Sequence, residues 1–188
     1  MNSLKTIFWI IILLVVPGFM EANLLAQASK VDALKKMVID YNEFDDRTTY
    51  QDSTSPSTVD DNGIYLSIFA HDHKKKPAFI SLKIRYYADE WLFIQSYSFS
   101  IDGQRYSFRP IQVFRDHDEK IWERSADVLD ANIYRIVKAI IKSKTARIRF
   151  NGTQSSDDRE ITDEEKQAMK NVLDAYKELG GDFSFIAK

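Results

Sequence analysis

The sequence contains no cysteine among its 188 residues. Disulfides, cysteine nucleophiles, thiolate metal sites and a lipid-modified N-terminal cysteine are therefore excluded. Phosphate-binding glycine loops, dinucleotide fingerprints and the Gly-x-Ser-x-Gly nucleophile motif are also missing. The formal net charge is −2 and no basic stripe stands out, which argues against nucleic acid as a partner.

The one long hydrophobic run lies at the N-terminus. Residues 7–16 are uninterrupted apolar residues followed by Pro17-Gly18, a run too short to cross a bilayer as a helix. Ala26 and Ala28 then supply the small residues that a signal peptidase requires. This pattern predicts a cleaved secretory signal over residues 1–28, with an uncleaved anchor as the alternative. The remaining chain would be periplasmic or secreted, without a membrane span.

The rest of the chain, residues 29–188, has the length of a single domain with one core. Apolar and polar residues alternate over 64–70 and 80–87, which predicts two strands. A tight turn at Asp89-Glu90 would pair the second strand with the segment from Phe93, with Leu82 opposite Tyr97. Asp102-Gly103 predicts a type I′ hairpin turn. Residues 31–44 have apolar residues at helical spacing, which favours a helix whose end could run into a strand.

Two helices are expected in the C-terminal third. Asp130 is a candidate N-cap for the first, and Thr162 to Glu165 form a capping box that opens the second. Residues 146–150 alternate as a strand between them. These elements predict an α+β fold: an antiparallel meander of about six or seven strands with tight hairpins, packed by two or three helices.

Several segments resemble, in their layout, a type of small exported bacterial domain of unknown function. They are DDRTTY, YYADEWLFIQSYSFSIDG, IWER, ARIRFNG and ITDEEKQAMKNVLDAY, and together they span residues 45–176. The resemblance implies no active site.

Histidines and paired carboxylates are the candidates for catalysis or metal binding. His71 and His73 lie close in sequence, but a meander would place His117 at the opposite end of the sheet, so no metal and no cofactor is expected. Adjacent carboxylates in loops do not imply the spacing that a glycosidase needs. A secreted hydrolase that uses carboxylates brought together by the fold is an alternative function.

A serine-rich strand suggests a binding surface. In the predicted register, one face of the sheet carries hydroxyl and cationic side chains beside aromatic rings. An anionic or sugar-like ligand would suit these groups. The candidate residues are Lys83, Arg85, Tyr87, Ser96, Ser98 and Arg105.

The sequence therefore favours a non-catalytic binding or accessory domain with a shallow basic, serine-rich sheet face. An ordinary solvated face is the simplest alternative for this surface. A structural subunit that contacts an envelope protein is a third possibility.

Overall fold

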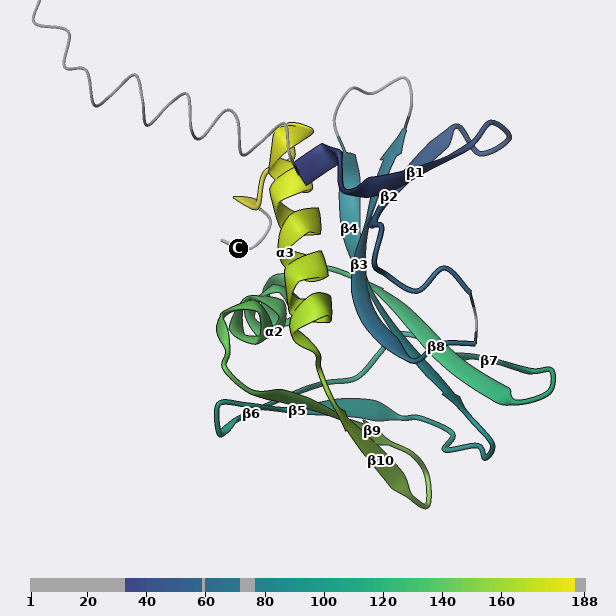
Figure 1. Cartoon of the computed structure of the whole chain (residues 1–188). Coiled ribbons are helices and arrows are strands. Elements are labelled where there is room, and N and C mark those ends of the chain that lie inside the picture. The colour runs from purple at the N-terminus through teal and green to yellow at the C-terminus, as the bar shows by residue number, and fades with distance from the viewer. Residues whose placement is uncertain (1–32, 59, 72–76, 185–188) are drawn as a thin grey trace, which may run out of the picture.

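The computed structural model describes residues 33–58, 60–71 and 77–184 (Figure 1). Its strands form two antiparallel sheets, and two helices accompany them. The six-stranded sheet has the order β1 (Met37–Asn42), β2 (Arg47–Asp52), β3 (Gly63–His71), β4 (Pro77–Ala88), β8 (Ile121–Val128) and β7 (Phe114–His117). The four-stranded sheet has the order β10 (Ser156–Glu160), β9 (Ala146–Asn151), β5 (Ser96–Ile101) and β6 (Gln104–Phe108). The helices are α2 (Ala131–Lys142) and α3 (Asp163–Glu178).

The two helices lie in the angle between the two sheets (Figure 1). Helix α3 packs on β2 and β3, and α2 contacts both α3 and β6. Each sheet buries the alternate apolar residues of its inner face, and these join the helix residues in one core cluster. The opposite, outer faces of both sheets remain available for polar side chains.

The predicted α+β fold with antiparallel strands is confirmed, but the strands form two sheets instead of one meander. The predicted pairing of Leu82 with Tyr97 is wrong. Strand β4 pairs with β3 and β8, whereas Tyr97 pairs with Phe108 and Phe150. Alternation in the sequence shows which residues share a face of a strand, and it does not identify the neighbouring strand.

Residues 37–42 of the segment 31–44 form strand β1, so the favoured helix is wrong there and the alternative, an end that runs into a strand, is confirmed. The Asn42 side chain accepts hydrogen bonds from the backbone of Phe44 and Asp45 and so supports a turn into β2. Val38 and Tyr41, two of the apolar residues at helical spacing, are more than half exposed, at 56% and 51%. The local turn and the pairing with β2 outweigh a weak helical spacing.

The shorter-range predictions are confirmed. Asp102 and Gly103 have positive φ values of 45° and 82° and close the β5–β6 hairpin in two residues, as a type I′ turn requires. The Asp130 side chain caps α2. Thr162 and Glu165 form both hydrogen bonds of the capping box of α3.

The segment expected to carry the secretory signal lies outside the described residues. Within the described ranges, no helix is long and apolar enough to cross a membrane.

The crossover from one sheet to the other is held by a buried carboxylate, Glu123 of β8, which is 0% exposed. Its two oxygens accept hydrogen bonds from three consecutive backbone N–H groups, those of Leu92, Phe93 and Ile94, at 2.9, 2.8 and 2.8 Å. The Arg115 Nε–H donates to the same carboxylate at 2.8 Å, and its Nη2 donates to the Ile94 carbonyl at 2.9 Å. Glu123 therefore satisfies the backbone of a buried segment that has no strand partner.

We expect Glu123→Ala to lower the free energy of unfolding by about 3–5 kcal/mol, because it leaves the Arg115 Nε–H and three backbone N–H groups without an acceptor. Urea unfolding measures the loss. Asp89→Ala is the control: Asp89 forms an exposed ion pair with Lys120, so its loss should cost about 1 kcal/mol or less. Equal stability losses in the two variants would contradict this role of Glu123.

Candidate anion-binding site

The structure divides the six predicted site residues between the two sheets. Lys83, Arg85 and Tyr87 lie on β4 of the six-stranded sheet, whereas Ser96, Ser98 and Arg105 lie on β5 and β6 of the four-stranded sheet. The prediction that all six residues share one face is therefore wrong. It depended on pairing β4 with β5, which are separated by the crossover at residues 92–94.

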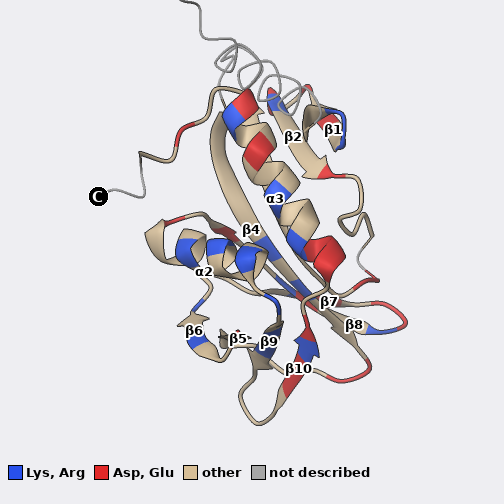
Figure 2. Ribbon diagram, turned by 60° about the vertical axis from the view of Figure 1, so that its left-hand side comes forward, with Lys and Arg blue, Asp and Glu red and all other residues tan. Residues whose placement is uncertain are grey.

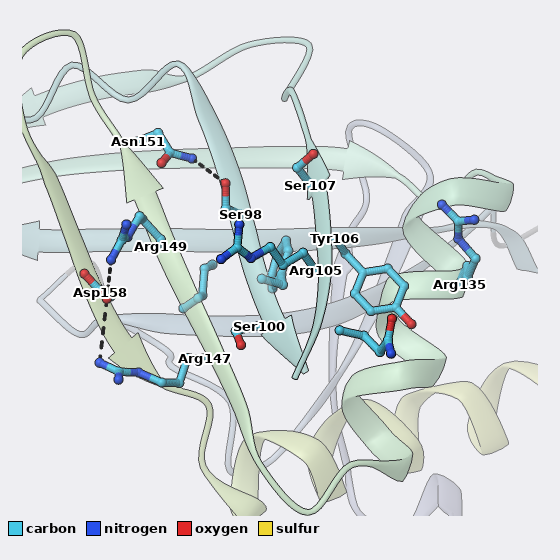
Figure 3. Close-up of a pocket in the computed structure, with 13 residues that line it drawn as sticks. Ser98, Ser100, Arg105, Tyr106, Ser107, Arg135, Arg147, Arg149, Asn151 and Asp158 are labelled. Atoms are coloured by element: carbon cyan, nitrogen blue, oxygen red, sulfur yellow. Dashed lines mark hydrogen bonds and ion pairs between the residues drawn. The ribbon is translucent and has the colours of Figure 1, made fainter. Parts of the chain in front are cut away.

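The serine-rich face itself exists, as the outer face of the four-stranded sheet. Pairing places Ser100 between Arg105 of β6 and Arg147 of β9, and Ser98 between Ser107 of β6 and Arg149 of β9. Two adjacent rows of serine and arginine therefore cross three strands (Figure 3). We call this surface the arginine–serine face: Ser98, Ser100, Arg105, Ser107, Arg147 and Arg149.

An open cavity of about 860 Å³ lies over this face. Five of the six side chains of the arginine–serine face are exposed, and Ser98 is half-buried. Arg135 of α2 also lines the cavity, with its guanidinium 5.9 Å from the centre of the Tyr106 ring. Figure 3 shows Arg105, Arg147 and Arg149 over one surface, with Arg135 at its far edge. Long cationic side chains from three elements can therefore reach one ligand.

One carboxylate, Asp158 of β10, lines this cavity. It lies 2.9 Å from Arg149 Nη2 and 3.6 Å from Arg147 Nη2. The hydrogen bond from Arg149, followed by the charges of Arg149 and Arg147, holds the pKa of Asp158 below its ordinary value. Asp158 positions these two guanidinium groups and neutralises only part of their charge.

Ser98 is fixed from the end of β9. Asn151 Nδ2 donates to the hydroxyl of Ser98 at 2.9 Å and to that of Ser96 at 3.2 Å. Both hydroxyls therefore accept a bond from the protein and keep their own hydrogen to donate. The predicted residue Ser96 belongs to this supporting hydrogen-bond network beside the cavity.

Sequence reasoning missed Arg147, Arg149 and Arg135. The run RIRF alternates with buried Ile148 and Phe150, so it already placed both β9 arginines on the outer face. The sequence did not show that β9 pairs with β5, the strand that carries Ser96, Ser98 and Ser100. Arg135 was missed because α2 was considered only for its buried stripe.

The two described histidines, His71 and His117, do not come together. His71 ends β3 near the Pro77 end of β4, whereas His117 pairs with Ile121 beside Ala88, at the other end of β4. His73 lies outside the described residues. Within the parts of the chain that the structure describes, no cluster of three or more potential metal ligands occurs.

Comparison of the chain with family models, curated proteins and solved structures finds no match. The interpretation of the site therefore depends on its own geometry.

We expect Arg149→Met to raise the pKa of Asp158, because the hydrogen bond that stabilises the carboxylate is lost. Arg147→Met should raise it less, since that guanidinium is farther away, and Arg105→Met should leave it unchanged. Carboxyl ¹³C NMR titration of each variant measures the pKa directly. An equal rise in the Arg105 variant would show that the general field of the face, and not the Arg149 contact, sets this pKa.

Proposed function

We propose that this protein is a non-catalytic binding domain that takes an acidic carbohydrate on its arginine–serine face. The observation that carries the proposal is the pairing of serine with arginine in two adjacent rows across β6, β5 and β9. Each row offers a guanidinium for a carboxylate or sulfate and a hydroxyl for a neighbouring sugar oxygen.

The dimensions of a sheet suit a repeating ligand. Rows on one face repeat about every 6.8 Å along a strand, and strands lie about 4.8 Å apart. Basic residues also occur along α2, where Figure 2 shows several blue segments: Arg135 and Lys142 are exposed and Lys138 is half-buried. An elongated polymer with regularly spaced negative charges can contact all of these groups, whereas a single small anion cannot.

The alternative of a secreted hydrolase has no supporting observation at this face. Three of the carboxylate pairs noted in the sequence each contain a residue that forms an ion pair. These residues are Asp45 with Arg47 at 3.3 Å, Asp89 with Lys120 at 3.1 Å, and Asp158 with Arg149 at 2.9 Å. Such contacts position cations and stabilise turns.

A partner-binding subunit is the second candidate, favoured by a specific feature of β1 and its turn. Val38, Ile39, Tyr41 and Phe44 are all more than half exposed, and Phe44 is 94% exposed. Exposed apolar side chains grouped on one hairpin are typical of contact surfaces.

We also propose that the chain is exported and that the signal is removed after Ala28. The support is the short charged start, the apolar run and the small residues before the cleavage position. When the full chain is expressed in a bacterium with a C-terminal tag, the intact mass of the exported product should begin at Ser29. Ala28→Arg should abolish this processing. An exported product that retains Met1 would contradict the proposal.

The carbohydrate proposal is tested by titrating the purified protein with polygalacturonate, dextran sulfate and neutral dextran. We expect the charged polymers to bind, more weakly at higher salt, and dextran not to bind. Arg147→Gln combined with Arg149→Gln should weaken binding at least about tenfold, since each charge-assisted hydrogen bond contributes about 1.5–3 kcal/mol.

The matched control is Lys35→Gln combined with Lys177→Gln, which removes the same charge from exposed positions elsewhere on the protein. It should change binding by less than about twofold. If both double variants weaken binding equally, the polymers respond to total charge and the arginine–serine face is not a site. If neither charged polymer binds, the partner-binding alternative is favoured.

A further inference from the structure

A second cavity lies on the outer face of the six-stranded sheet, and its central residue is a buried arginine. The cavity has a volume of about 520 Å³ and is lined by residues of β1 to β4, β7, β8 and the loop after β2. Pro56 of that loop packs on Gly63, where a Cβ atom would lie 2.6 Å from the proline ring. We call this cavity the arginine basin, defined by Arg47, Tyr65, Phe69, Lys83, Arg85 and Arg124.

Arg85 is 7% exposed, so its guanidinium is almost completely removed from solvent. Its Nη2 donates to the hydroxyl of Tyr65 at 3.0 Å. Its Nε and Nη1 are buried and have no acceptor among the described residues. A buried charged group with unpaired donors is costly, and a bound ion or ligand is one of the explanations for its presence in a native protein.

The neighbours of Arg85 increase its positive field instead of cancelling it. Arg124 stands directly opposite on β8, and like charges in facing positions are destabilising. Lys83, two residues along β4, faces the same way. Burial and then the charges of Arg85, Arg124 and Arg47 lower the pKa of Lys83. Lys83 therefore experiences a positive field that no neighbouring carboxylate balances.

The carboxylates that line the basin do not form ion pairs with its central cations. Asp52 is 2% exposed and accepts hydrogen bonds from Thr54 and from Asn171 of α3. Asp40 is an exposed residue of β1. Asp45, outside the cavity lining, contacts Arg47 at 3.3 Å. None of these three acids has a hydrogen bond or ion pair with Lys83, Arg85 or Arg124 among the described residues.

Aromatic rings occupy the positions where acids would be expected. Lys83 Nζ lies 5.7 Å from the centre of the Tyr65 ring and 5.5 Å from that of Phe69. The guanidinium of Arg85 lies 5.8 Å from the Tyr65 ring, and that of Arg124 lies 5.8 Å from Phe114. Rings hold cations in place without neutralising them, and they also offer apolar contact to a ligand.

We propose that the arginine basin binds a small organic anion, with a carboxylate or phosphate group held by Arg85 and a compact apolar body against Phe114, which lies in the same row of the sheet as Arg85 and Arg124. The anion supplies the acceptors that Arg85 Nε and Nη1 lack. It also offsets the repulsion between Arg85 and Arg124. This site lies on a different sheet from the arginine–serine face and shares no residue with it, so either proposal can fail alone.

The test titrates the purified protein with benzoate, phenyl phosphate, inorganic phosphate and, as a neutral probe, benzyl alcohol. We expect saturable binding of benzoate or phenyl phosphate, with inorganic phosphate weaker because it has no apolar body. In Arg85→Met the binding should weaken by about tenfold or more. Arg105→Met, which removes an arginine of the other sheet, should bind as the original protein does. Benzoate and phenyl phosphate distinguish the carboxylate from the phosphate.

The melting temperature in buffer free of these anions provides a second readout. If Arg85 is an uncompensated buried charge, Arg85→Met should melt at the same temperature as the original protein or higher. An arginine with a purely structural role would instead lower it. If Arg85→Met does not fold, Arg124→Met serves for the titration and should weaken binding by several fold.

Three outcomes would overturn the proposal. The first is that neither benzoate nor phenyl phosphate saturates the protein by about 10 mM. The second is that binding is unchanged in Arg85→Met. The third is that benzyl alcohol binds as tightly as benzoate, which would make the basin an apolar cavity. Inorganic phosphate binding as tightly as phenyl phosphate would overturn the apolar contact.

Discussion

The carboxylate of Glu123 determines how the two sheets meet. Residues 92–94 leave one sheet and enter the other without a strand partner, and their three N–H groups donate to this one side chain. The carbonyl of Leu92 is satisfied from the other side by the Thr153 N–H at 3.1 Å. Gly152 permits that approach, because a Cβ atom there would lie 2.1 Å from the Leu92 oxygen. The crossover is therefore held between β8 and the turn after β9.

Further buried polar groups of β8 continue this contact between the sheets. Ser125 receives a hydrogen bond from the Tyr97 hydroxyl at 3.2 Å, and Asp127 accepts one from the Ile111 backbone at 2.8 Å. Burial raises the pKa of Tyr97, so its hydroxyl remains protonated and can donate. Glu123, Ser125 and Asp127 alternate on the inner face of β8. Directional hydrogen bonds at this seam fix the relative position of the sheets more specifically than apolar contact would.

Features that depend on nearby residues could be predicted from the sequence, and features that depend on distant pairing could not. The Asp102-Gly103 turn, the caps of α2 and α3, and the inward residues of β9 follow from local chemistry. The crossover that separates β5 from β4 bonds to Glu123, about thirty positions along the chain, and nothing in the local pattern reveals that contact. The prediction of the site was likewise correct in its local features and wrong in its long-range ones. Serines and arginines were assigned to outer faces correctly, yet Lys83 and Ser98 were grouped although their strands belong to different sheets.

The division into two sheets has a consequence for binding. A chain with a formal net charge of −2 nevertheless concentrates arginine on the outer faces of both sheets. The two surfaces differ in what surrounds the cations. On the arginine–serine face the guanidinium groups are exposed, supported by Asp158 and beside hydroxyls, so a hydrated polymer can exchange for water at low cost. In the arginine basin Arg85 is buried beside the Tyr65 ring, and its Nε and Nη1 have no acceptor among the described residues, so the proposed ligand would bring its negative charge into a partly dry site. Solvent exposure, more than charge, distinguishes the ligands that we propose for these two faces.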